Sequence, residues 1–398
     1  MSEKYKTLFL PKAEYLPGGF DSLCKVLDEA EAKKKKLRVK LGIDPTSTDL
    51  HIGHTVCLHI LRKFQDLGHL PVLLIGGFTA TVGDPSGRNE ARPALTYTQV
   101  EENAKTYLDQ VKKILDLNKV EIVNNFDWLN KLTLKEVIEL AHTVTINQLI
   151  AKEAFGSRIS NNLPLYLHEV LYPILQGYDS VQIKADIEIG GTDQKFNVLF
   201  GRFLQKHFNM PEQHAILLPL LIGLDGAKKM SKTFNNFISL KDAPNDVFGK
   251  TMSIPDEMII NYFQLVTDTP QDKINEYAKS LESGENPRNI KILLAHTLTR
   301  QIHSLGMADS SQETFIKQFS KSEIPEDIPE YNLANDIKIT DLMSLAQLTS
   351  SKTEAKNLIQ GGGVKLQGDK ISDINHLITV NDKNKVLQIG KRKFLKLI

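Results

Sequence analysis

The strongest constraint on the fold is a strand–helix–strand pattern near the N-terminus. Residues 37–43 (LRVKLGI) alternate enough to form a strand and are followed by a DP turn. Apolar residues at helical spacing run from about Gly53 to Leu67, and the short apolar run 71–75 (PVLLI) stops at two glycines. Such a run is typical of a strand buried in a parallel sheet. The segment predicts a right-handed βαβ unit and an α/β fold of the doubly wound kind.

Later segments predict how the chain divides. A helical pattern over about 98–117 precedes an apolar strand candidate at 120–123, which continues the α/β pattern. From about 246 to 319 the pattern is helical, without clear strand runs. Residues 321–336 are acidic, contain two prolines and lack periodicity, as linkers do. We expect a first domain at 1–230, an all-α domain at 231–320, a linker at 321–336 and a small α+β module at 337–398.

The C-terminal module combines a short helix, strand candidates and basic charge. Ser351 and Glu354 have the spacing of a capping box, glycines 361–363 end the helix, and 364–366 (VKL) suit a strand. Residues 350–398 hold ten Lys or Arg against four Asp or Glu, about +6, whereas the whole chain has a net charge of +1. Basic charge gathered at one end suits a polyanion-binding module. A solvated lysine-rich tail is the alternative.

Composition excludes several classes of protein. With 398 residues, 41% hydrophobic and 24% charged, the chain is expected to form two or three ordinary globular domains. Cys24 and Cys57 make no CxxC pair and no disulfide framework. The first ten residues lack the apolar run of a signal peptide, and no stretch approaches the roughly 18 apolar residues of a membrane span. We therefore expect a protein of the reducing cytoplasm, without a membrane partner.

The first motif that carries chemistry is His51-Ile-Gly53-His54, placed after a strand and at the start of a helix. A helix N-terminus favours phosphate through its unpaired N–H groups and its dipole. Gly53 lets a base or a phosphate approach the backbone, and the two histidines can donate to phosphate oxygens. Two alternatives are surface histidines on an amphipathic helix and a metal set with His59, although no acid or thiol nearby completes such a set.

The second motif is the lysine-rich segment 228–233 (KKMSKT), which follows the glycine-flanked turn 223–226. Lysine is a mobile point charge that can move onto a polyphosphate. In isolation, an exposed lysine-rich turn is the better interpretation.

Three further segments carry polar side chains at informative spacing. Tyr172, Gln176 and Asp179 are separated by offsets that place them on one helix face. Such a face suits a buried polar ligand, because buried polar groups need partners; a polar solvent face is the alternative. The turns 83–88 (GDPSGR) and 190–194 (GGTDQ) are ordinary turns when taken alone.

Together, the two motifs resemble the HIGH and KMSKS signatures of class I aminoacyl-tRNA synthetases, in the family's order and on an α/β scaffold. The resemblance implies that ATP is a substrate, that it arrives with Mg²⁺, and that there is no prosthetic group or protein metal site. It further implies that His51, His54, Lys229 and Lys232 hold the ATP phosphates through the transition state. Thr233 stands where the family usually has Ser and keeps the hydroxyl.

The segment 172–179 closely resembles the tyrosine-binding helix of tyrosyl-tRNA synthetases. This resemblance implies that Tyr172 and Gln176 hold the substrate ammonium and that Asp179 accepts a hydrogen bond from the phenol. One departure is Lys40, which stands four residues before the DPT turn, where many members of the family have a tyrosine as the second partner of the phenol.

The two glycine-containing turns also resemble loops of this family. By this resemblance, Asp84 pairs with the ammonium and Gln194 helps to position the substrate. Gly53 belongs to the ATP-binding set, and the remaining members of that set are Arg88 and Arg92 on the pyrophosphate side and Gly191 and Asp193 on the ribose.

The resemblance covers roughly residues 35–398 and is greatest to the second bacterial type of tyrosyl enzyme, because the C-terminal segment resembles a small RNA-binding module. It implies a Rossmann-like catalytic domain, an all-α domain on the anticodon side and a basic RNA-binding module. It also implies a homodimer with an inserted interface at about 125–180, and L-tyrosine and tRNA(Tyr) as partners in a bacterial cytoplasm.

Three other interpretations remain open from the sequence. The tryptophanyl enzyme is the nearest, although the face formed by residues 172–179 and the basic module count against it. A non-catalytic RNA-binding relic would not need the phosphate-holding histidines and lysines. A different adenylyl or nucleotidyl transferase would have the same fold, because one fold hosts many functions.

Overall fold

The computed structural model describes residues 3–86, 95–349, except 321–327, and 351–398, except 391–392. Arg88 and Arg92, two of the expected phosphate-side residues, lie outside the described residues. The chain forms two compact units, residues 1–312 and 313–398, and each is described by itself.

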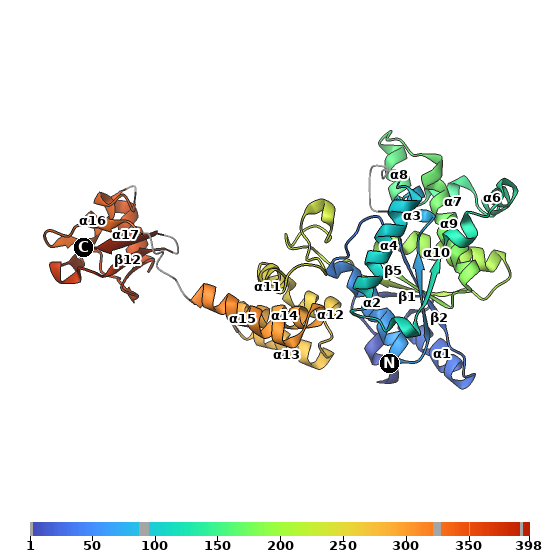
Figure 1. The fold of residues 1–398 in the computed structure, drawn as a ribbon, viewed down its shortest axis with the longest axis horizontal. Helices are drawn as coiled ribbons and strands as arrows, with labels where there is room; N and C mark the ends of the chain where they lie inside the picture. Colours follow the sequence, from blue (N-terminus) through green and yellow to red (C-terminus); the bar gives the residue numbers. More distant parts are fainter. Residues whose placement is uncertain (1–2, 87–94, 321–327, 350, 391–392) are drawn as a thin grey trace. The chain divides into compact units, whose positions relative to one another are not determined.

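The first unit is built on a six-stranded sheet (Figure 1). Across the sheet the strands are β1 (Glu14–Leu16), β6 (His214–Leu218), β5 (Ile187–Gly191), β2 (Arg38–Ile43), β3 (Leu70–Ile75) and β4 (Glu121–Asn124). All neighbours are parallel except β1, which runs antiparallel to β6. The predicted parallel sheet and its first βαβ unit are therefore confirmed.

Helices cover both faces of this sheet. Those that pack against it or beside it are α1 (Gly19–Ala32), α2 (Ile52–Asp66), α9 (Leu167–Ile183) and α10 (Lys195–His207). Because successive strand residues point to opposite faces, Leu41 of β2 shares a core with Leu58 of α2, whereas Val72 of β3 packs with Ile183 at the end of α9. The sheet is doubly wound, as the sequence predicted.

One predicted helix is shorter in the structure. The pattern suggested a helix over about 98–117, but the observed helix is α4 (Tyr97–Val111). Thr96 and Gln99 start it with a reciprocal capping box. Beyond its end, the Asp116 side chain accepts from the Asn118 N–H and begins a separate 3₁₀ turn, Leu117–Lys119, so the apolar spacing continues after the helix has stopped.

The chain between β4 and β5, which was expected to hold an inserted interface, is helical. Besides α9, its helices are α5 (Phe126–Leu129), α6 (Leu134–Ala141), α7 (Ile146–Ile150) and α8 (Glu153–Ser160). They have their own small core, in which Phe155 of α8 packs with residues of α9 and α10.

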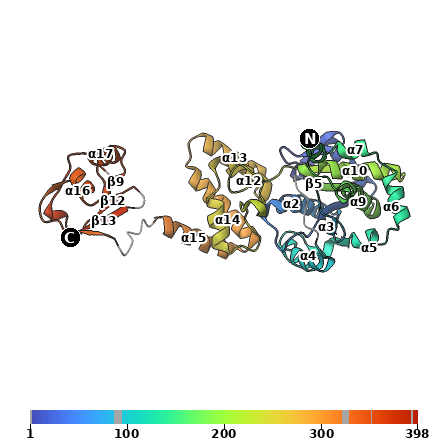
Figure 2. The ribbon, with the colours of Figure 1, turned by 90° about the horizontal axis from the view of Figure 1, so that it is seen from above.

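The last part of the first unit is helical, with α12, α13 and α14 grouped together (Figure 2) and α11 beside them (Figure 1). These helices are α11 (Pro244–Met252), α12 (Ile259–Val266), α13 (Gln271–Glu282) and α14 (Pro287–Ile302). The following helix, α15 (Leu305–Ser320), continues past residue 312, where this unit ends. The segment before α11 is not helical as a whole, because Ser239 forms a bridge back to His51 at the start of α2. The helices therefore begin later than residue 231, the expected boundary.

The second unit is a small α+β module with its own core. Its main sheet has the order β10 (Asp369–Lys370), β9 (Val364–Leu366), β12 (Val386–Ile389), β13 (Lys393–Leu397) and β7 (Glu330–Tyr331). A second small sheet pairs β8 (Ile337–Lys338) with β11 (Leu377–Ile378), and the helices are α16 (Ile339–Leu345) and α17 (Lys352–Gln360). Ser351 caps α17 through the Glu354 N–H at 3.1 Å.

The boundary of this module needs a correction. Residues 321–336 were expected to form a linker, yet β7 lies inside that range and pairs in parallel with β13. Ladder bonds such as Ile398 N–H to the Tyr331 carbonyl tie this segment to the end of the chain. A two-residue strand between prolines and acids is too short to show a periodic pattern in the sequence.

In the described part of the chain, no helix is long and apolar enough to cross a membrane.

Candidate active site

A cleft of about 1040 Å³ opens at the carboxyl edge of the parallel strands. Its walls come from the segments that follow β2, β3 and β5, from the start of α2, from one face of α9 and from the KMSKT segment. Ligands of open α/β sheets bind outside the carboxyl ends of the strands, where neighbouring crossovers leave a crevice. All the described residues predicted for the site line this cleft.

The two histidines of the first motif organise the start of α2. The His51 Nδ1 accepts from the Gly53 N–H at 3.2 Å, and the His54 Nδ1 accepts from the His51 N–H at 3.2 Å. Burial lowers the pKa of His51 to about 2 and that of His54 to about 4, so both rings are neutral. Because the His51 Nδ1 accepts, its ring proton sits on Nε2. The His54 Nδ1 also lies 3.2 Å from the His51 carbonyl oxygen, and each neutral ring carries one N–H donor and one acceptor nitrogen.

Two glycines are required by close approach in this cleft. A Cβ on Gly53 would lie 2.9 Å from the His51 ring, so a side chain there would displace the cap. A Cβ on Gly191 would lie 2.7 Å from the Asp193 Oδ1, in the loop expected to hold ribose. Both positions keep backbone open beside polar groups, which is what a nucleotide needs for close contact.

The KMSKT segment contacts two of the loops that line the cleft. Ser231 accepts from the Thr233 N–H and starts a short 3₁₀ turn, Lys232–Phe234. The Lys229 Nζ lies 3.0 Å from the Asp193 Oδ2, and the Lys232 Nζ lies 2.9 Å from the Ser47 Oγ. Burial lowers the pKa of Lys232 from its ordinary value. The structure thus brings both predicted lysines to the loops that follow β5 and β2.

Another part of the cleft, where the sequence predicted amino-acid binding, is formed by α9. The Tyr172 hydroxyl donates to the Asp44 Oδ2 at 2.8 Å. Asp179 is buried and accepts from the Asn125 Nδ2 at 3.1 Å and from the Trp128 Nε1 at 2.8 Å. Burial raises the pKa of Asp179 to about 7, against the opposing effect of the positive charge of Lys40. The predicted carboxylate is therefore held by two donors at the closed end of the cleft.

Asp84 and Gln194, predicted from different loops, meet directly. The Gln194 Nε2 donates to the Asp84 Oδ2 at 2.7 Å, and the Ser86 N–H donates to the other oxygen at 2.9 Å. Gln194 in turn accepts from the Asn197 Nδ2 at 2.9 Å. This chain of bonds fixes a negative charge beside the α9 face.

Sequence reasoning missed several residues of this site. Asp44, which follows β2, receives Tyr172, while Asn125 and Trp128 hold Asp179. A usable signal existed, since polar residues directly after buried parallel strands lie at the binding edge. Asn125 follows β4 in this way, and Trp128 is the only tryptophan of the chain.

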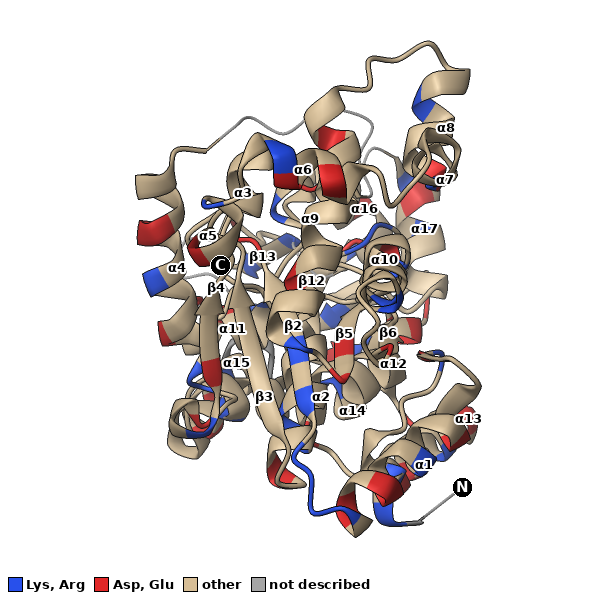
Figure 3. Ribbon diagram, turned by 90° about the vertical axis from the view of Figure 1, so that its right-hand side faces the viewer, with Lys and Arg blue, Asp and Glu red and all other residues tan. Residues whose placement is uncertain are grey.

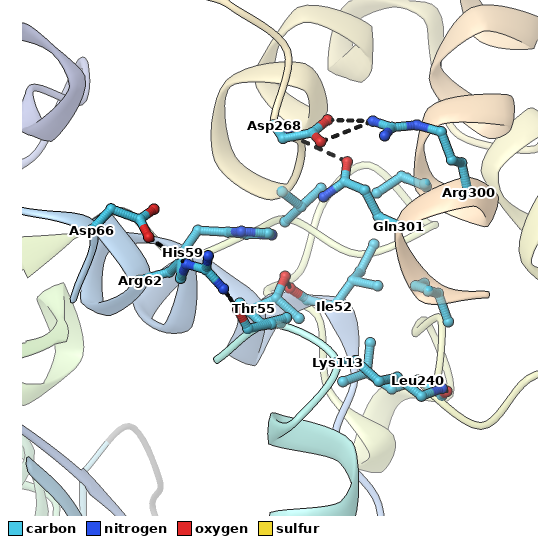
Figure 4. A pocket seen from close by; sticks show the side chains of 14 residues that line it. Ile52, Thr55, His59, Arg62, Asp66, Lys113, Leu240, Asp268, Arg300 and Gln301 are labelled. Carbon is cyan, nitrogen blue, oxygen red and sulfur yellow. Dashed lines mark hydrogen bonds and ion pairs between the residues drawn. The ribbon is translucent and has the colours of Figure 1, made fainter. Parts of the chain in front are cut away.

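A second cavity, of about 420 Å³, lies between α2 and the helices α12 and α14 (Figure 4). Its charged side chains pair with one another: the Arg300 Nη2 lies 2.6 Å from the Asp268 Oδ1, and the Arg62 Nε lies 2.8 Å from the Asp66 Oδ1. His59 lines this cavity and not the main cleft. Among the described residues, no group of three or more His, Cys, Asp or Glu could hold a metal ion.

Comparisons with known proteins agree with this geometry. Residues 32–320 match the family described as tRNA synthetases class I (W and Y), and residues 320–397 match the tyrosine–tRNA ligase SYY-like C-terminal domain. The fold resembles that of a C-terminally truncated mitochondrial tyrosyl-tRNA synthetase of Coccidioides posadasii, with a TM-score of 0.63, 23% identity, and coverage of 78% of this chain and 89% of that one. The chain belongs to the class I tRNA synthetases of the tryptophan and tyrosine family.

Curated relatives identify the branch within that family. The tyrosine–tRNA ligase of Thermotoga maritima is 46% identical over 366 residues, which cover 92% of this chain and 91% of the relative. That of Carboxydothermus hydrogenoformans is 44% identical over 393 residues, covering 97% and 95%. Within the family, the branch is that of the tyrosine–tRNA ligases.

Proposed function

We propose that the main cleft is the active site of a tyrosine–tRNA ligase, with the nucleotide at the α2 end and tyrosine against α9. The enzyme joins L-tyrosine to ATP, which gives tyrosyl-adenylate and pyrophosphate, and then passes the tyrosyl group to tRNA(Tyr). The observation that carries the assignment of the cleft is the meeting of two phosphate-type motifs with a buried carboxylate, Asp179, in one cavity.

The first reaction needs positioning and charge and not a protein nucleophile. A tyrosine carboxylate oxygen forms a bond to the α-phosphorus of ATP, and the bond from that phosphorus to the β-phosphate bridging oxygen breaks. The Nε2–H group of His51, the neutral ring of His54 and the ammonium groups of Lys229 and Lys232 stabilise the charge that develops on the phosphates. Mg²⁺ binds hard oxygen ligands and arrives on the ATP phosphates.

The nucleotide sugar and its remaining phosphates need further partners. Asp193 accepts from the ribose hydroxyls, and Gly191 leaves room for the sugar. Lys229, which contacts Asp193 at 3.0 Å, links this loop to the phosphates. Arg88 and Arg92 are proposed for the pyrophosphate side on the sequence resemblance alone.

Tyrosine is recognised at both of its ends. Tyr172, Gln176 and Asp84 surround the substrate ammonium, and Gln194 orients Asp84 through their 2.7 Å bond. Asp179 accepts from the phenol hydroxyl. A ligand without that hydroxyl removes a partner from a buried carboxylate, which costs at least about 1–3 kcal/mol. The same pocket therefore binds tyrosine and discriminates against phenylalanine.

The second unit is proposed to bind tRNA. Its basic residues Lys352, Lys356, Lys365, Lys370 and Lys383 are exposed. Lysines on a small folded module suit the phosphate backbone of RNA, and such contacts weaken as salt rises. Binding there keeps tRNA(Tyr) on the enzyme while its 3′ end enters the cleft.

We further propose a homodimer whose interface lies in the inserted region. Large apolar side chains are exposed there at 76% for Leu134, 62% for Ile146 and 72% for Leu167. Large apolar side chains exposed to solvent in one inserted region favour an interaction site, and we propose that a second copy of this chain covers them. Leu167→Asp is expected to give a monomer in sedimentation, and an unchanged sedimentation coefficient would refute this interface.

The activation step is tested by ATP–pyrophosphate exchange with tyrosine, phenylalanine and tryptophan. Exchange with tyrosine alone is expected. Exchange driven by tryptophan would reassign the amino acid, and adenylate formation without tRNA charging would favour a different adenylyl transferase.

A further inference from the structure

A buried ion pair forms part of the wall of the cleft beneath α9. Lys40 and Glu188 are register partners on the neighbouring strands β2 and β5, which carry blue and red segments respectively in Figure 3. The Lys40 Nζ lies 3.0 Å from the Glu188 Oε1, and the two side chains are 0% and 2% exposed. Both residues line the same cleft as Gln176 and Asp179.

Lys40 has no proton left for a ligand. Its ammonium group carries three N–H donors, and three acceptors surround it: the Ser180 Oγ at 2.8 Å, the Gln176 carbonyl at 3.2 Å and Glu188. A lysine at this position therefore does not replace the phenol-binding tyrosine of other family members by donating to the phenol itself.

Glu188 contacts side chains of the same turn of α9 as Lys40 does. It accepts from the Gln176 Nε2 at 3.3 Å, from the Ser180 hydroxyl at 3.0 Å and from the Gln213 Nε2. The pair thus fixes the backbone of Gln176 through Lys40 and its side chain through Glu188. Asp179 lies between Gln176 and Ser180 on that turn.

Stability alone is a poor explanation for such a pair. Burying two charges costs desolvation that their attraction rarely exceeds, and well-packed apolar residues of similar volume are often as stable. A charged pair in the wall of a binding cleft, bonded to the helix turn that recognises the ligand, suits a role in placing that turn.

We propose that Lys40 and Glu188 are positioning residues for tyrosine: they hold the turn 176–180 so that Gln176 faces the ammonium and Asp179 faces the phenol. The inference rests on the proposed function and adds the source of its amino-acid selectivity. Its consequence is that damage to the pair weakens tyrosine recognition and leaves ATP recognition unaffected, because its bonds reach α9 and not the start of α2.

The experiment compares Lys40→Met, Glu188→Gln and the double variant with the unmodified enzyme. Tyrosine affinity is measured by equilibrium dialysis. Pyrophosphate exchange gives the KM values for tyrosine and ATP, and also the ratio of the exchange rate with tyrosine to that with phenylalanine. Tyr15→Phe is the matched control, because it removes buried hydrogen bonds to Leu8 and Leu10 outside the cleft.

Lys40→Met is expected to weaken tyrosine binding by about tenfold or more, the equivalent of about 1.4 kcal/mol. The selection against phenylalanine should fall with it, while the KM for ATP stays near that of the unmodified enzyme. The double variant should lose less than the sum of the single losses, because the two sites interact directly.

Two outcomes would overturn the inference. One is unchanged tyrosine affinity and selection in the single variants. The other is an equal weakening of tyrosine and ATP recognition, which is the pattern that a general structural change such as Tyr15→Phe would give. If Lys40→Met does not fold, the nearly isosteric Glu188→Gln decides by the same measurements. No tyrosine-dependent exchange in the unmodified enzyme would instead refute the proposed function.

Discussion

Replacing Asp179 by asparagine tests the amino-acid end of the cleft with almost no change of shape. The carboxylate accepts from the Asn125 amide and the Trp128 indole, and the proposed phenol hydroxyl is a third donor. An ionised carboxylate offers about four acceptor sites, whereas an amide offers one oxygen and a nitrogen that only donates. With donors on both sides, the amide side chain of the Asp179→Asn variant therefore cannot satisfy all three groups.

The size of the effect follows from the lost bond. A hydrogen bond to a charged group contributes about 1.5–3 kcal/mol, which corresponds to roughly a 10- to 150-fold loss of tyrosine affinity. Phenylalanine makes no such bond, so its use should be unchanged or improved. Pyrophosphate exchange measures the use of tyrosine and of phenylalanine, and the preference for tyrosine over phenylalanine should fall sharply in the variant.

A matched control is Asp66→Asn, which changes an exposed carboxylate of α2 outside the main cleft. It should leave the exchange rates for both amino acids unchanged. If Asp179→Asn keeps the tyrosine-to-phenylalanine ratio of the unmodified enzyme while remaining folded, the assignment of Asp179 to the phenol is wrong.

Three other predictions concern pH, phosphate and RNA. Burial raises the pKa of Asp179 to about 7, so the contribution of this group to the free energy of unfolding is complete below about pH 4 and is lost as pH rises through 7. Tyrosine affinity, measured by dialysis, should instead rise through pH 7 as the carboxylate ionises. A tyrosine affinity that does not change between pH 6 and 8 contradicts this prediction. Lys232→Ala should lower kcat of exchange by about tenfold or more without changing tyrosine binding in dialysis, and equal losses would argue against a transition-state role. Lys365→Glu, an exposed change in the second unit, should weaken tRNA binding most at low salt, make that binding less steeply dependent on salt and leave exchange intact, which filter binding across salt concentrations checks.

Periodicity in the sequence predicted the parts of the fold that depend on local spacing. The run 71–75 is a buried strand within the sheet, and the apolar stripe of the helix before it packs on one face of that sheet, as their apolar spacing indicates. The edge strand β1 and the two-residue β7 lacked such a signal, because their pairing depends on partners about 200 and 65 residues away. Non-local pairing leaves little trace in a short segment.

The candidate site divides in the same way. Residues that occupy fixed positions in a motif, such as His51 or Lys229, could be predicted from spacing together with resemblance. Asn125 could have been noticed as a polar residue directly after a strand, but neither its contact with Asp179 nor that of Trp128 follows from the sequence. Those contacts depend on the order of the strands, in which β3 and β2 lie between β4 and β5. Residues that orient a functional group are found by geometry, since any donor of the right length can serve.

Lys40 shows where pattern reasoning and geometry complement each other. Within the run LRVKLGI it looks like an exposed position of an alternating strand, and within the family it is a departure that removes an expected phenol partner. In the structure it is fully buried, and the reason lies in Glu188, at the same level of the neighbouring strand. Opposite charges at paired positions of two buried parallel strands are each costly alone and acceptable only together. A lysine and a glutamate in apolar strand runs therefore indicate each other, and their joint presence marks the sheet position where the ligand-binding helix is anchored.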